Sequence, residues 1–124
     1  MSTPWPAVLL DTIVTADGLK VSPLRADGRS FGSSTWIWCV RVDDDLYVRA
    51  HHGPSSRWYA AALAHPVGRI HAARQALDVT FDPAPDSLAD RIDAAYRDKY
   101  TESPYFAPMV ARGPRAACFR IIPR

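Results

Sequence analysis

The chain has 124 residues, of which 48% are hydrophobic and 23% charged, and its formal net charge is +2. This length and composition predict one globular domain, residues 1–124, around one core. No apolar run approaches the ~20 residues of a membrane span, no secretory signal pattern opens the chain, and neither Cys39 nor Cys118 lies in a zinc-binding pattern. We expect a cytoplasmic protein with no membrane association and no bound metal.

The charged residues are unevenly distributed. From Leu46 to Leu77 there is no Asp or Glu, although four arginines and all four histidines fall in that segment. Between Asp78 and Glu102 the balance reverses, with seven acids against two arginines and one lysine. Uncompensated positive charge in the first segment favours an anionic ligand such as a phosphate group. The alternative is a solvated basic face opposite an acidic helix.

The first part of the chain predicts a helix, a strand and a loop. Apolar residues from Val8 to Val14 recur at helical spacing, and the pattern stops near Asp17-Gly18. Residues 19–24 predict a short strand, which Pro23 confines to a sheet edge or a strand end. Residues 25–34 contain two glycines and three serines and predict a long loop, a common place for functional residues.

A β-hairpin is predicted next. Thr35–Val42 and Leu46–Ala50 are rich in β-branched and aromatic residues and flank Asp43-Asp44-Asp45. A three-residue acidic turn would pair Val42 with Leu46, Arg41 with Tyr47 and Cys39 with Arg49, gathering Arg41, Tyr47, Arg49 and His51 on one face. Because both faces of the first strand carry apolar side chains, both need cover, which favours a barrel or a sandwich.

The second half of the chain alternates strands and helices. A turn at residues 52–57 leads into a short helix, Trp58–His65, ended by Pro66, and two strands follow at residues 67–72 and 77–81. Ser87 begins a capping-box pattern, and apolar residues recur every four positions behind it, which predicts a helix over residues 87–100. The last predicted strand is Ala117–Ile122.

An anion site is predicted where the short helix begins. Ser55, Ser56 and Arg57 supply hydroxyls and a permanent positive charge just before a helix N-terminus, where free amides and the helix dipole favour an anion. Arg49 and Arg41 could reach the same anion from the hairpin. The alternatives are an ordinary N-cap with a surface arginine and, for Arg49 and Arg41, pairing with one of Asp43–Asp45 or with Asp98.

Four segments carry a resemblance to known proteins: Trp38-Cys-Val-Arg-Val, Leu46-Tyr-Val-Arg-Ala, Ser56-Arg-Trp-Tyr and Tyr96-Arg-Asp-Lys-Tyr100. They resemble, over nearly the whole chain, a bacterial family of unknown function thought to share the split barrel of pyridoxamine 5′-phosphate oxidases and deazaflavin-dependent nitroreductases. In those flavoproteins a Ser-Arg or Ser-Lys pair before a short helix clamps the cofactor phosphate, and the helix ends in Asn-Pro. Here Ser56-Arg57 and His65-Pro66 stand in those places.

The resemblance implies an α+β protein, an antiparallel split β-barrel with flanking helices, that binds FMN or a deazaflavin. Its ring would lie against Trp38 or the partner subunit of a homodimer, although Trp36, Trp38, Tyr96 and Tyr100 also suit core packing. The predicted cofactor-binding residues are Trp38, Arg49, His51, Ser55, Ser56, Arg57 and Trp58.

These expectations define a flavin- or deazaflavin-dependent oxidoreductase acting on a small organic molecule, with its catalytic residues unidentified. The alternative is a barrel without a cofactor that binds, isomerises or cyclises such a molecule. Nucleic-acid binding is not expected, because the basic segment carries no recognised motif and the acidic helix opposes an extended footprint.

Overall fold

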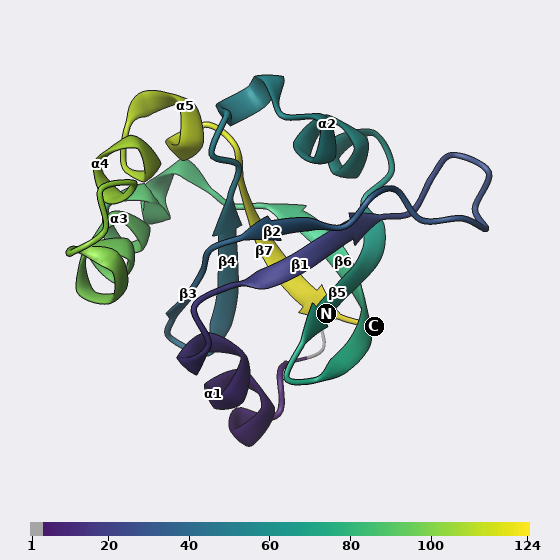
Figure 1. Cartoon of the computed structure of the whole chain (residues 1–124), viewed down its shortest axis with the longest axis horizontal. Helices are drawn as coiled ribbons and strands as arrows, with labels where there is room; N and C mark the ends of the chain where they lie inside the picture. Colours follow the sequence, from purple (N-terminus) through teal and green to yellow (C-terminus); the bar gives the residue numbers. More distant parts are fainter. Residues whose placement is uncertain (1–3) are drawn as a thin grey trace.

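The computed structural model describes residues 4–124 as seven antiparallel strands in a nearly closed barrel with five flanking α-helices (Figure 1). The strands are β1 (Leu19–Pro23), β2 (Thr35–Ile37), β3 (Cys39–Val42), β4 (Asp45–Arg49), β5 (Val67–Ala72), β6 (Gln75–Pro83) and β7 (Cys118–Pro123). The helices are α1 (Ala7–Thr15), α2 (Arg57–Ala64), α3 (Ala89–Tyr100), α4 (Phe106–Met109) and α5 (Arg112–Arg115), with 3-10 turns η1 (Gly53–Ser55) and η2 (Asp86–Leu88).

One chain segment supplies both edges of the sheet. The strand order is β2-β1-β5-β6-β7-β4-β3, and every neighbouring pair is antiparallel. The edge strands β2 and β3 are consecutive in the chain and separated by Trp38 alone. The predicted continuous strand over residues 35–42 is therefore broken at Trp38, and this break lets the segment pass from one edge to the other. The predicted α+β antiparallel split barrel with flanking helices is confirmed.

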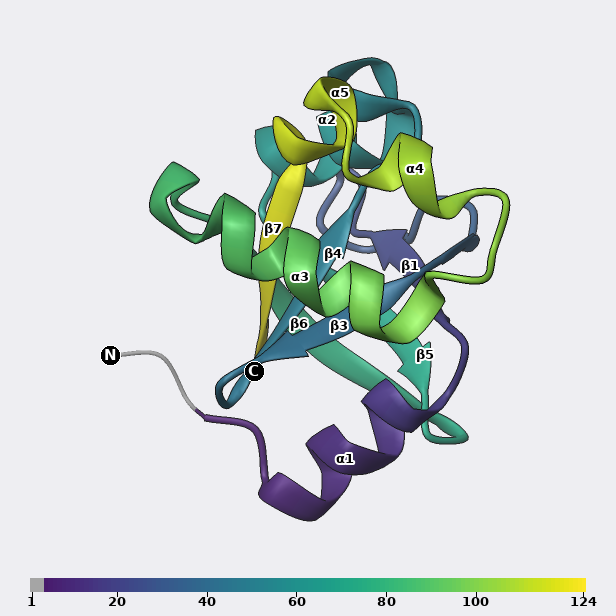
Figure 2. The same cartoon turned by 90° about the vertical axis from the view of Figure 1, so that its left-hand side faces the viewer.

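Successive side chains along residues 35–42 point to opposite faces and so contribute to two separate hydrophobic cores. Ile37 and Cys39 belong to the barrel core, whereas Val40 and Val42 lie on the opposite face and pack against α3. Figure 2 shows α3 crossing that face. The apolar side chains of α3 that cover it are Ile92, Tyr96 and Tyr100, the stripe predicted from the four-residue spacing. The second face of β3 is therefore covered within this chain.

The register of the predicted hairpin is wrong by one residue. The turn holds only Asp43 and Asp44, so that Val42 pairs with Asp45 and Cys39 with Val48. Asp43 adopts the left-handed conformation (φ 55°), which Asp tolerates better than most residues. A one-residue shift moves side chains to the other face, so Tyr47 packs beside Val40 on the α3 side, away from the face predicted for it.

The other elements differ from prediction at helix ends. The predicted cap at Ser87 is wrong: Asp86–Leu88 form a 3-10 turn, α3 begins at Ala89, and neither segment has a side-chain cap hydrogen bond. The two four-residue helices α4 and α5 were not predicted. By contrast, β5 has the predicted bounds, and α1 buries Leu10 and Ile13 as its spacing requires.

Candidate functional site

The candidate site is a groove along edge strand β2, below α2 in Figure 1. Its larger part, the polar hollow, is a cavity of about 680 Å³ lined by all of β2 and by His51, His52, Ser55, Ser56, Arg57 and Trp58. The smaller part, the aromatic hollow, has a volume of about 230 Å³ and is lined by Trp38, Tyr105 and Met109 among others. Trp36, Ile37 and His51 line both parts, so the two hollows adjoin.

The polar hollow lies at the N-terminus of α2. Ser56 occupies the N-cap position and is only 7% exposed, yet its hydroxyl caps no amide and has no hydrogen-bond partner in the described chain. The first-turn amides, from Arg57 to Tyr59, have no acceptor within the helix. A free hydroxyl and free first-turn amides at one point can together donate hydrogen bonds to an acceptor from a ligand.

Arg57 supplies the positive charge of this hollow. Its side chain is exposed, and within residues 4–124 it takes part in no ion pair. Arg69, from the same acid-free segment, pairs instead with Asp78 across β5 and β6. An uncompensated guanidinium beside a helix N-terminus is suited to bind an anion.

Ser55 and Trp58 support the site from behind. The Ser55 hydroxyl donates to the His52 carbonyl oxygen (2.8 Å), which closes η1. Trp58 is 7% exposed and packs on Phe119 in the barrel core, with 6.0 Å between ring centroids. Both residues line the hollow, and their hydrogen bond and packing fix the start of α2.

Gly53 and Gly113 lie in close contact at this end of the groove. Gly53 has φ 65°, and a Cβ there would lie 3.0 Å from the Gly113 carbonyl carbon in α5. A side chain at Gly53 would therefore be strained by the backbone conformation and would crowd the backbone of α5. The close approach of η1 and α5 positions the turn that carries His52 and Ser55.

The aromatic hollow is built on the break between β2 and β3. Trp38 stacks on Tyr100 of α3, with ring centroids 3.9 Å apart and planes 2° apart. Trp36 is 54% exposed and Tyr105 is 63% exposed, and the Tyr105 ring lies edge-on to His51 at 6.3 Å. Sequence reasoning missed Tyr105, for which the only signal is the aromatic pair that follows Pro104.

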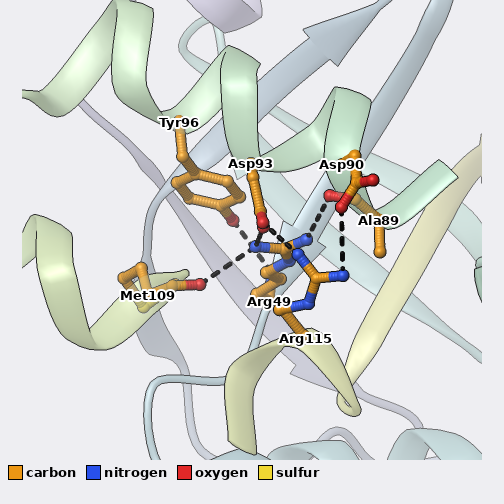
Figure 3. Close-up of polar contacts among 7 residues, drawn as sticks. All are labelled: Arg49, Ala89, Asp90, Asp93, Tyr96, Met109 and Arg115. Atoms are coloured by element: carbon orange, nitrogen blue, oxygen red, sulfur yellow. Dashed lines mark hydrogen bonds and ion pairs between the residues drawn. The ribbon is translucent and has the colours of Figure 1, made fainter. Parts of the chain in front are cut away.

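Arg49 is directed elsewhere. It is fully buried, and its guanidinium donates to Asp93 (2.5 Å) and to the carbonyl oxygens of Met109 (3.0 Å) and Ala89 (3.1 Å) (Figure 3). Arg115 binds the second oxygen of Asp93. Although Arg49 lines the aromatic hollow, its charge is neutralised by Asp93, a partner that the sequence did not suggest. The structure therefore does not bring this guanidinium to Ser56 and Arg57.

Arg41 is also occupied, because it pairs with Asp11 and Asp44 at the turn of the hairpin.

Around Arg49, burial raises the pKa of the Cys118 thiol to about 11, an effect that the neighbouring guanidinium partly offsets. Burial likewise raises the pKa of Tyr96, whose hydroxyl accepts the Arg49 amide at 3.0 Å. These groups stay protonated near neutral pH and serve the structure.

Over residues 4–124, no group of three or more His, Cys, Asp or Glu side chains is arranged to hold a metal ion. Within the same range, no helix is long and apolar enough to cross a membrane.

The strand order, with one broken segment at both edges, defines a split-barrel protein, and three solved structures share the fold. A conserved hypothetical protein from Mycobacterium tuberculosis is 14% identical over 98% of this chain and 80% of its own (TM-score 0.59). An FAD-binding protein from Mesorhizobium loti is 11% identical over 99% and 91% (TM-score 0.56). An F420 reductase is 16% identical over 98% and 94% (TM-score 0.53).

The chain belongs to the family DUF2255, described as uncharacterised proteins conserved in bacteria, whose sequence pattern matches residues 9–121. No protein with a curated description matches the chain.

Proposed function

We propose that the groove along β2 binds a flavin-type cofactor, FMN or a deazaflavin, and that the protein is an oxidoreductase acting on a small organic molecule. The observation that carries this proposal is the junction of two unlike hollows: an anion-binding helix N-terminus at Ser56 and Arg57 adjoins an aromatic hollow at Trp36, Trp38 and Tyr105. A flavin nucleotide has the same division, with a phosphate at one end and a planar ring at the other. The combined space falls within the range of small-molecule sites.

The residues present fit such a cofactor. The phosphate would accept hydrogen bonds from the Ser56 hydroxyl, the Arg57 guanidinium and the first amides of α2. The ring would lie against Trp36 and Tyr105, while Trp38 is held by its stack on Tyr100. A bound flavin supplies the hydride chemistry, and these side chains orient it and exclude water.

The comparisons support the cofactor class. Two proteins with this fold are by name an FAD-binding protein and an F420 reductase, and F420 is a deazaflavin. Arg49 has no part in our assignment of the phosphate, because it lines the aromatic hollow and not the polar hollow and its charge is paired with Asp93.

A cofactor-free function is the second candidate. His51 lines both hollows, so an imidazole stands where a bound organic molecule would pass from the polar to the aromatic part. Such a group can move a proton in an isomerisation or cyclisation without a redox cofactor.

The absorbance spectrum of the purified protein separates the two candidates. We expect the protein to take up added FMN or deazaflavin, with a shift of the flavin bands and quenching of tryptophan fluorescence. Ser56→Ala should weaken this uptake, whereas Ser87→Ala, an exposed serine outside the groove, should not. A protein that takes up neither compound would leave the cofactor-free candidate.

We also propose that the protein is a homodimer, with the open side of the groove, where Trp36 and Tyr105 remain exposed, against a second copy. The second face of β3 is not part of this proposed interface, because α3 covers it. For location we propose the cytoplasm, since Cys39 and Cys118 are both free thiols, as is usual in a reducing compartment.

A further inference from the structure

We propose that a third hollow, next to the polar hollow, is a second anion subsite centred on Arg25, and that the groove therefore takes a flavin dinucleotide whose diphosphate spans both. This inference rests on the proposed flavin site for the position of the ring. The loop hollow, as we call it, has a volume of about 360 Å³. It shares Thr35, Arg57 and Trp58 with the polar hollow, so Arg57 stands between the two.

The charged side chains that line the loop hollow are all positive. Arg25 and Arg57 line it together with Gly32, Ser33 and Thr35, and in the described chain no Asp or Glu lines it. Neither arginine takes part in an ion pair within residues 4–124. Two guanidinium groups around one hollow repel each other unless an anion lies between them. A single phosphate at Ser56 would leave Arg25 without a partner.

The loop that carries Arg25 has a defined shape. The Asp27 carboxylate accepts hydrogen bonds from the amides of Arg29 (2.9 Å) and Ser30 (3.0 Å) and from the Ser30 hydroxyl (2.7 Å). The Arg25 amide donates to the Ser30 carbonyl oxygen at 2.8 Å, and Leu24 pairs with Phe31. Asp27 forms no ion pair with Arg25 within residues 4–124, although the positive charge of Arg25 adds to the hydrogen bonds that lower the Asp27 pKa.

A diphosphate matches this arrangement. Its two phosphoryl groups are separate anions joined by one bridging oxygen, so one can occupy the helix N-terminus at Ser56 while the next lies between Arg57 and Arg25. FMN carries only the first of these groups. We therefore expect FAD to bind more tightly than FMN and the difference to depend on Arg25.

The test measures Kd values of FMN, FAD, inorganic phosphate and inorganic pyrophosphate by calorimetry for the wild type, Arg25→Ala and Arg29→Ala. Arg29 is the matched control, because it is exposed on the same loop and unpaired but does not line the hollow. Arg25→Ala should weaken FAD and pyrophosphate by about tenfold and leave FMN and phosphate within about twofold. Arg29→Ala should change none of the four beyond that.

The second subsite would be wrong if Arg25→Ala and Arg29→Ala lost the same affinity for FAD, or if Arg25→Ala lost the same affinity for FMN as for FAD. The proposed flavin site would stand in either case. If no flavin binds but pyrophosphate binding depends on Arg25, the anion subsite stands and the proposed function fails. If pyrophosphate binds no more tightly than phosphate and FAD no more tightly than FMN, the inference is wrong.

Discussion

Asp93 forms ion pairs with two arginines, Arg49 at one carboxylate oxygen and Arg115 at the other. The Arg49 guanidinium is fully buried and Asp93 is 15% exposed, so the pair is shielded from water. Removing one partner of a buried pair leaves the other charge without compensation, which costs far more than the pair itself contributes. The pair thus ties β4 to α3, and within the described residues the buried Arg49 Nε atom is left without a hydrogen-bond partner.

Asp93→Ala should therefore lower the free energy of unfolding by about 3 to 5 kcal/mol. Chemical denaturation with urea measures the loss. The control is Arg91→Ala, which breaks the exposed pair with Asp43 (2.7 Å) and should have little measurable effect. Similar losses in the two variants would show that the Arg49 pair is not shielded as described.

Asp27 gives a pH-dependent prediction. Hydrogen bonds from the amides of Arg29 and Ser30 lower the pKa of Asp27 from 3.8 to about 2. A depressed pKa stabilises the folded loop above pH 3.8, and this contribution is lost as pH falls through about 2. NMR titration of the Asp27 carboxyl should give a midpoint near 2, and Asp27→Asn should loosen the loop at neutral pH. A midpoint at the ordinary value would mean that the loop is not held by this carboxylate.

Among the elements, the turn between β5 and β6 places its two residues in a backbone conformation that they disfavour. Ala73 and Arg74 both have positive φ, 51° and 61°, as a two-residue hairpin turn requires. Asn at the first position and Gly at the second adopt these angles at lower cost. Ala73→Asn combined with Arg74→Gly should raise the free energy of unfolding by about 1 kcal/mol. Lower stability in thermal or urea unfolding would contradict the assigned turn.

Element-level patterns explain which parts of the fold the sequence could predict. The four-residue spacing of Ile92, Tyr96 and Tyr100 marked α3 because burial of one helix face requires it. The hairpin register could not be fixed, because Asp45 can end a three-residue turn or begin a strand, and the choice moves every later side chain to the other face. Helices α4 and α5 have four residues each, too few to show a period.

The candidate site, like the fold, could be predicted from the sequence only in part. His51, Ser55, Ser56, Arg57 and Trp58 converge on one hollow because they are neighbours in sequence around one helix start. The partner of Arg49 could not be assigned from the sequence, because Asp93 lies 44 positions away. The sequence also left open the hairpin register, which decides the face on which Arg49 lies. Tyr105 follows α3, and only the folding of the chain brings it to β2, whereas Arg25 lies in the loop between β1 and β2, which the sequence marked as a long loop without singling out this residue.

At the scale of the whole molecule, the proposed homodimer can be tested through its exposed aromatic side chains. Sedimentation velocity at micromolar concentration should show a dimer, and Trp36→Ala should shift it toward monomer because a half-exposed indole supplies apolar contact area. Val8, 80% exposed on α1, is the control, since it lines neither the polar nor the aromatic hollow. A wild-type monomer would remove the proposed interface, as would equal dissociation in Val8→Ala.

In the function that we propose, Arg57 at the start of α2 binds the phosphate of a flavin-type cofactor. Calorimetric titration of FMN and a deazaflavin into Arg57→Ala and Arg74→Ala tests it most directly, because both arginines come from the same acid-free segment and neither is paired in the described chain. Arg57→Ala should weaken binding by about 1.5 to 3 kcal/mol, roughly ten- to a hundredfold, with unchanged melting temperature in the absence of ligand. Arg74→Ala should bind as the wild type does. Equal losses in the two variants, or unaltered binding in Arg57→Ala, would show that Arg57 does not form a specific phosphate site.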